Sequence, residues 1–398
     1  MSNIEATTAG GRAVSLRFEA AEHLDRIART RAELRRRGLA ALLVFSQESH
    51  NYLTGFDTAG YVFFQVGVIT ADDGPTVVLT RRPDLRQAEV ASIYDDIRIW
   101  LNADGVNPAL ELRKILEELD CGGDKVGVEF ASYGLTGANS RMVEQALDGF
   151  CTLEDASDVV RTLRLLKSPA ELAYVRQAGK LADAATRAMI DATHPGILDS
   201  EVTAAGVSTM LRGGGDMPAG GPLVNSGPRA LYGRGIGAPR RLEDTDQMML
   251  ELGASFCRYH VCIEHTVVIG KVDPRHRDML AVAAEALSEI TDSARAGREL
   301  GTLDDIHRRV LDKAGFAKER FSACGYALGA TFRPTWMDVP PMIYSGNPLV
   351  MQPGMVFFVH IMIPDTSTGL AAGLGQTFVI TDGASEVLSD IPLELYCR

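Results

Sequence analysis

Residues 250–266 read LELGASFCRYHVCIEHT, and this stretch decides how the second half of the chain folds. It predicts a β-hairpin, in which an apolar strand (Met248 to Leu252) and a glycine-containing connection precede a second strand whose alternate residues share one face. The polar or reactive residues on that face are Arg258, His260, Cys262 and Glu264. Because buried polar groups must be paired, these side chains either satisfy one another or serve a substrate.

The composition bounds the class of protein. A chain of 398 residues is long enough for two domains, and 46% hydrophobic with 23% charged residues is typical of a soluble globular protein. The net charge of −12 argues against a nucleic-acid partner. Six cysteines without C-x-x-C spacing indicate a reducing, cytoplasmic location. We find no apolar run long enough for a bilayer and no secretory signal, so no membrane partner is expected.

The pattern of elements predicts two domains. Residues 1–162 alternate helical and strand patterns, which indicates an α/β domain. Residues 163–398 open with a helix that Ser168 can cap, with Pro169 in its first turn and Glu171 completing a capping box. The helices and apparently antiparallel strands that follow predict an α+β layer architecture.

Five motifs carry a family resemblance. In chain order they are LRLLKSPAEL (163–172), NSGP (225–228), the hairpin above, CGYALG (324–329) and QPGMV (352–356). The chain thereby resembles the pita-bread family of creatinase, prolidase and aminopeptidase P. The resemblance implies a C-terminal pita-bread domain of α+β class, preceded by a smaller creatinase-like α/β domain.

The same resemblance predicts that the metal site has been lost. Metallopeptidases of the family bind two metal ions through two aspartates, a histidine and two glutamates. These positions fall on Glu251, Cys262, Tyr326, His360 and, last, Gly375 or Gln376, and none is retained in kind. Two hard divalent ions need several anionic oxygens, so no metal and no cofactor is expected. A single zinc on Glu251, Cys262, His260 and His360 stays open as an alternative.

Two members of the family are closest in motif. Glu264, two residues before Thr266, resembles creatinase, whereas Arg258-Tyr259-His260 and Pro334-Thr335-Trp336 resemble ectoine hydrolase. The resemblance implies metal-independent hydrolysis of an amidine or amide C–N bond in a small, polar, non-peptide substrate. The creatinase acid/base histidine falls on Arg234, which stays protonated and can grip a carboxylate but cannot take up a proton.

Roles follow for the remaining polar residues. We expect His260 or His360 to be the base, with Glu264 and Tyr326 polarising the substrate. Cys262 is interpreted as a core residue. The residues expected to bind substrate are Arg234, Tyr232, Glu251, Arg258, Trp336, Asp338 and Gln376. All are expected around the pita-bread domain's pocket, although either histidine could instead be a hydrogen-bonded core residue.

Assembly and competing functions complete the expectations. The resemblance implies a homodimer in which Ser46, Glu48, His50 and Tyr52 of a neighbour's first domain complete the site. The alternatives are a lyase or cyclase using the same acid/base groups, a single-zinc enzyme resembling Xaa-Pro peptidases, and a non-catalytic binding module. The sequence does not distinguish hydrolysis from elimination, nor does it identify the substrate.

Overall fold

The structure is a computed structural model that describes residues 3–8 and 10–398. Contacts divide it into two compact units, residues 1–164 and 165–398, each with its own hydrophobic core. The sequence placed this boundary after residue 162. In the described part of the chain, no helix is long and apolar enough to cross a membrane.

The first unit is built on a mixed six-stranded sheet in the order β6-β5-β4-β3-β7-β8. Strands β5 and β6, β3 and β7, and β7 and β8 pair in parallel, as expected for the α/β domain predicted from the sequence. Its elements are β1 (Ile4–Thr7), β2 (Ala13–Leu16), α1 (Ala20–Arg37), β3 (Ala41–Val44), α2 (Gln47–Thr54), η1 (Gly60–Val62), β4 (Val66–Thr70), β5 (Val77–Arg81), η2 (Arg82–Asp84), α3 (Leu85–Ala91), β6 (Asp96–Trp100), α4 (Pro108–Glu118), β7 (Lys125–Val128), α5 (Gly137–Leu147), β8 (Thr152–Asp155) and α6 (Asp158–Leu165).

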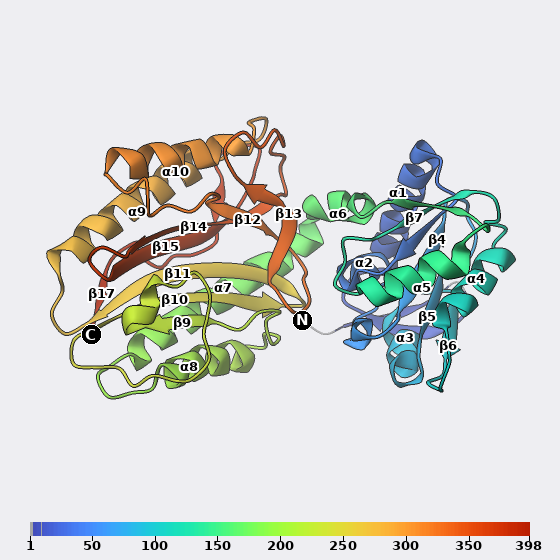
Figure 1. Cartoon of the computed structure of the whole chain (residues 1–398), viewed down its shortest axis with the longest axis horizontal. Coiled ribbons are helices and arrows are strands. Elements are labelled where there is room, and N and C mark those ends of the chain that lie inside the picture. Colours follow the sequence, from blue (N-terminus) through green and yellow to red (C-terminus); the bar gives the residue numbers. More distant parts are fainter. Residues whose placement is uncertain (1–2, 9) are drawn as a thin grey trace. The chain divides into compact units, whose positions relative to one another are not determined.

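The second unit carries a nine-stranded sheet whose main path is β13-β12-β14-β15-β11-β10-β9 (Figure 1). Every pairing along this path is antiparallel, so the predicted α+β class is confirmed. Its elements are α7 (Pro169–Ala192), α8 (Asp199–Arg212), β9 (Leu223–Ser226), η3 (Gly227–Leu231), β10 (Asp246–Phe256), β11 (Tyr259–Ile269), α9 (Pro274–Ser293), α10 (Gly301–Lys313), β12 (Gly325–Leu328), β13 (Met337–Ile343), β14 (Val356–Asp365), β15 (Leu370–Val379), β16 (Glu386–Val387) and β17 (Tyr396–Cys397).

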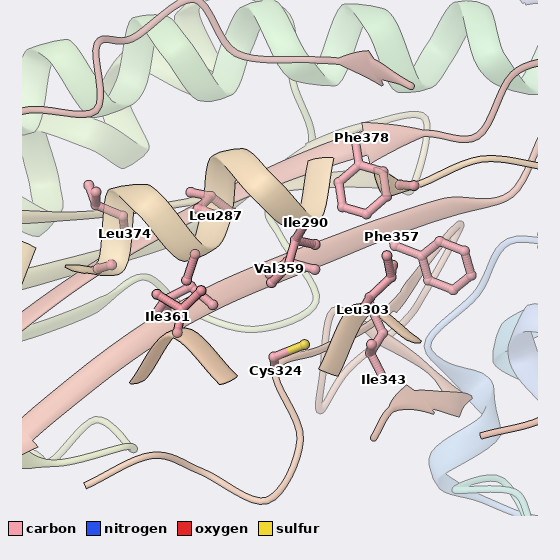
Figure 2. Packing of buried hydrophobic residues seen from close by; sticks show 14 of the residues in the cluster. Leu287, Ile290, Leu303, Cys324, Ile343, Phe357, Val359, Ile361, Leu374 and Phe378 are labelled. Carbon is pink, nitrogen blue, oxygen red and sulfur yellow. The ribbon is translucent and has the colours of Figure 1, made fainter. Parts of the chain in front are cut away.

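Residue parity separates the two faces of this sheet. On β14, Phe357, Val359 and Ile361 enter the hydrophobic core that α9 and α10 cover (Figure 2). Phe378 opposite Phe357 and Leu374 opposite Ile361, both on β15, belong to the same core. Because successive strand residues point to opposite faces, His360 lies on the face away from these helices.

The expected capping box of α7 is present, since Glu171 N–H donates to Ser168 Oγ and Ser168 N–H donates to Glu171 Oε2.

The hairpin of β10 and β11 differs from its prediction in one respect. The hairpin turn, however, consists of Cys257 and Arg258, with φ of 51° and 70°, and Gly253 lies inside β10. Primed two-residue turns need positive φ at their central residues, so Arg258 belongs to the turn and not to the strand face.

Candidate active site

An acidic cluster crosses four neighbouring strands on the face away from the helices. Glu251 of β10 pairs directly with Glu264 of β11, and Glu264 in turn pairs with Gly375 of β15. His360 of β14 lies opposite the same glycine. Paired residues of antiparallel strands share a face, so the two carboxylates and the imidazole point to one side.

Gly375 allows the imidazole of His360 to contact the carboxylate of Glu264 across β15. A Cβ built there would lie 2.6 Å from Phe358 Cζ and 3.0 Å from Glu264 Cβ. With no side chain in between, His360 Nδ1 and Glu264 Oε2 approach to 3.3 Å across β15. The two atoms form an ion pair, but Glu264 Oε2 is buried and has no hydrogen-bond donor in good geometry. We therefore treat the contact as electrostatic.

Tyr326 and Trp336 extend the cluster on its other side. Tyr326 of β12 is buried and its hydroxyl donates to Glu251 Oε1 at 3.3 Å. Trp336 Nε1 donates to the same hydroxyl at 2.9 Å. Trp336 is only 6% exposed, which leaves its ring little surface for the substrate contact expected from the sequence. Its indole N–H donates to the Tyr326 hydroxyl instead.

The surroundings of the cluster raise the pKa of two of its groups, Glu251 and His360. Burial raises the pKa of Glu251 to about 7; His360 opposes this shift and Glu264 adds to it. Burial alone would lower the pKa of His360, but the carboxylates of Glu264 and Glu251 outweigh it, and the net shift is upward. The cluster therefore combines an imidazole whose protonated form is favoured by two carboxylates with a carboxyl group able to give or accept a proton near pH 7.

Arg234 acts on this cluster from a loop. It follows η3 and is exposed, as is Tyr232, while Asn225 Nδ2 donates to the carbonyl oxygens of both residues. The Arg234 charge contributes to lowering the pKa of Glu251 and of His360. Its predicted grip on a substrate carboxylate is compatible with this placement and stays a prediction, as does substrate binding by Tyr232.

His260 does not join the cluster. It lies four residues along β11 from Glu264, roughly 13 Å at strand rise. Its Nε2 accepts from Ala219 N–H at 3.0 Å, which leaves Nδ1 protonated to donate to Thr331 Oγ1 at 3.1 Å. Burial lowers the pKa of His260 to about 4. It is a hydrogen-bonded core histidine, and the expectation that it shares a pocket with His360 as a base is corrected.

Three predicted substrate-binding residues also lie away from the cluster. Arg258 in the hairpin turn holds its guanidinium 5.0 Å above the Phe332 ring. Gln376 pairs with Val359, so its side chain faces the helix-covered core, one residue out of phase with Gly375. Asp338 is buried on β13, where its Oδ2 would lie 2.5 Å from a Cβ at Gly329. These positions support structural roles.

The first-unit residues proposed to complete the site are engaged within their own unit. His50 Nδ1 lies 2.7 Å from Tyr94 Oη, and burial lowers the pKa of His50 to about 3. Tyr52 is 3% exposed and stacks beneath the Arg26 guanidinium. Ser46 Oγ donates to Glu48 Oε2 at 2.6 Å. The rings of His50 and Tyr52 are packed inside the first unit, and a contribution of these four residues to a neighbour's site stays a prediction.

Comparison with known proteins identifies the family. Residues 173–382 match the model of metallopeptidase family M24, and residues 26–166 match the creatinase/prolidase N-terminal domain. The chain belongs to family M24. This M24 member is 26% identical over 393 residues to the uncharacterized hydrolase/peptidase y4tM of Sinorhizobium fredii, covering 96% of this chain and 99% of that protein.

Two further relatives agree with the predicted resemblance. The ectoine hydrolase of Halomonas elongata is 24% identical over 401 residues, covering 97% of this chain and 99% of that protein. A solved prolidase from Thermococcus sibiricus superposes with a TM-score of 0.85 at 20% identity, covering 96% of this chain and all (100%) of that one. The predicted pita-bread fold is thus confirmed, and the chain is an M24-family hydrolase whose bond specificity these likenesses leave open.

The family's pair of metal ions does not fit the residues present. The cluster offers two carboxylates and an imidazole; burial raises the pKa of the Cys262 thiol and the Tyr326 hydroxyl well above their usual ranges, so both stay protonated. Two divalent cations would keep most of their charge unbalanced. Across residues 3–8 and 10–398, only one trio of His, Cys and acidic side chains brings its ligand atoms within 4.8 Å of one another, and it lies elsewhere, at Asp304, His307 and Cys324.

That trio and one cavity are separate from the cluster. Asp304 already accepts hydrogen bonds from His307, Arg308 and Ser345 N–H, which accounts for its burial without an ion. A cavity of about 630 Å³ lies around Gln247, four residues along β10 from Glu251. The Gln247 amide is occupied by Gly227, Gly369, Ala371 and His276, so it braces the fold there.

Proposed function

We propose that this M24 member hydrolyses an amidine or amide C–N bond in a small, polar, non-peptide substrate, without a divalent metal ion. The observation that carries the proposal is the Glu251 carboxyl, with a pKa of about 7, beside the ion pair of His360 and Glu264. General acid/base catalysis works best when the pKa of the catalytic group is near the working pH. His360 also retains 17% side-chain exposure, which leaves the cluster accessible to small molecules.

Each group takes one role in the proposed reaction. The Glu251 carboxylate accepts a proton from water as the water oxygen bonds to the substrate carbon. Glu251 then returns that proton to the departing nitrogen as the C–N bond breaks, so atoms and charge balance. His360, whose protonated form the Glu264 carboxylate favours, stabilises the negative charge that develops on the heteroatom bound to the attacked carbon. Arg234 holds a carboxylate of the substrate.

The likeness to ectoine hydrolase supports the choice of substrate class. It extends over 97% of this chain, and ectoine is a cyclic amidine that carries a carboxylate. An amidine carbon matches the proposed attack at Glu251 and His360, and the carboxylate matches the proposed grip of Arg234. The loss of the family's metal ligands weakens the case for peptide substrates, whose hydrolysis in the family uses two metal ions.

Incubation with defined substrates tests the proposal. Chelator-treated protein would be mixed with ectoine, creatine or an Xaa-Pro dipeptide, and the products followed by proton NMR. We expect ring opening or C–N cleavage of a non-peptide substrate, reduced about 10²- to 10⁴-fold in Glu251→Gln. Glu243→Gln is the matched control, because this carboxylate is exposed and lies outside the cluster. Cleavage of the dipeptide alone, and only after a divalent metal is added, would overturn the proposal.

A further inference from the structure

The indole of Trp336 is held in one orientation by backbone. A Cβ built at Gly220 or at Gly253 would lie 3.0 Å from the indole ring, so both glycines let the ring pack directly on the chain. Gly253 lies two residues from Glu251 on β10. The ring is thereby fixed over the strand that carries the proposed acid/base group.

This orientation determines where the Tyr326 proton points. An indole N–H can only donate, so the Tyr326 oxygen must accept from Trp336 at 2.9 Å. A phenol has a single proton, and the other neighbour within hydrogen-bond distance is Glu251 Oε1 at 3.3 Å. The Tyr326 proton is therefore directed to the carboxyl group.

We propose that Trp336 is a positioning residue for the reaction: its indole N–H fixes the Tyr326 hydroxyl so that this hydroxyl donates to Glu251. The inference rests on the role of Glu251 given above. Chains of hydrogen bonds strengthen one another, so Trp336 also makes the Tyr326 hydroxyl a better donor. Without the indole N–H, the hydroxyl can rotate away, and the Glu251 carboxylate loses its aligned donor.

The first test needs no turnover, because the chain has only two tryptophans. Trp100→Phe leaves Trp336 as the sole indole, with its hydrogen bond intact. We expect its fluorescence to change with pH around the Glu251 pKa of about 7, and the change to vanish in Trp100→Phe with Glu251→Gln. Fluorescence that is flat between about pH 5 and 9 would overturn the positioning role.

Other ionisable groups face Glu251 and need their own control. They are Glu264 and Cys262 on β11, His360 on β14, Arg234 in the loop after η3 and Tyr326 itself. Burial lowers the pKa of His360, but the Glu264 and Glu251 carboxylates outweigh it and the net shift is upward, so this imidazole needs its own control. Adding His360→Gln to Trp100→Phe should shift the fluorescence transition without abolishing it. A transition that disappears with His360 and persists without Glu251 would contradict the assignment.

The second test uses the pH dependence of kcat. Trp336→Phe keeps an aromatic ring but removes the N–H. The part of the kcat profile that reflects ionisation of Glu251 should then move upward by about one pH unit, because the carboxylate loses an aligned donor, and Tyr326→Phe should have the same effect. Trp100→Phe is the matched control: it removes an indole N–H that donates to Phe64 O in the first unit, and should cause no shift. Unchanged profiles in Trp336→Phe would overturn the inference. The fluorescence transition without turnover of any substrate would support the alignment of the Tyr326 hydroxyl with Glu251 and count against the proposed reaction.

Discussion

Replacing Glu251 by glutamine should stabilise the second unit, and only at high pH. The pKa of this carboxyl rises from 4.5 to about 7 on folding, so the folded state binds its proton more tightly than the unfolded state. The contribution of Glu251 to stability is therefore most favourable below about pH 4.5, falls as the pH rises toward 7, and carries the full penalty above 7. At 1.36 kcal/mol per pKa unit, that penalty is at most about 3 kcal/mol.

Glutamine mimics the protonated acid and can still accept from the Tyr326 hydroxyl. Urea unfolding would be followed through Trp336 in the Trp100→Phe background, so that the signal reports on the second unit alone. We expect Glu251→Gln to equal its parent near about pH 4.5 and to exceed it by about 2–3 kcal/mol near about pH 8.5. A gain that is the same at both pH values, or a loss at the higher one, would refute the reasoning.

Two further substitutions test the architecture around the cluster. Gly375→Ala should lower the free energy of unfolding by about 1–3 kcal/mol and reduce activity, because its Cβ would lie 2.6 Å from Phe358 Cζ and force this ring against His360. Thermal unfolding and turnover would measure both effects, and unchanged stability would contradict the close packing. His260→Ala should destabilise the fold by about 2–4 kcal/mol through the lost partners of Ala219 and Thr331, yet leave the pH profile of the residual activity in place, and a collapsed profile would restore this histidine as a candidate base.

Much of the fold could be predicted from local signals. The capping box at Ser168 and the alternating pattern of β11 are short-range features, and the structure reproduces both. The hairpin turn could not be located, because Cys257 and Arg258 adopt positive φ, which such residues seldom do. The glycine at position 253 led to the wrong prediction that the hairpin connection lies there. Gly253 instead allows the close approach of Trp336 to β10, a contact between segments far apart in sequence.

Strand parity and family motifs together selected the residues of the candidate cluster. Glu251, Glu264, Tyr326 and His360 were all selected, and all four meet on one face. The prediction that His260 lies in the cluster was wrong, because two residues on the same face of a strand, such as His260 and Glu264, can still lie far apart along it. The hydrogen bond of Trp336 to Tyr326 lacks any sequence signal, since the two residues are joined through a loop whose path the pattern does not determine.

Turnover in water enriched in heavy oxygen tests the central claim most directly. If Glu251 activates water for attack on the carbon of a C–N bond, the product must carry one heavy oxygen atom at that carbon, which mass spectrometry detects. We predict full incorporation by chelator-treated protein, and labelled product that forms about 10²- to 10⁴-fold more slowly with Glu251→Gln. Product that forms at the normal rate without the label would contradict hydrolysis and indicate elimination or cyclisation by the same groups.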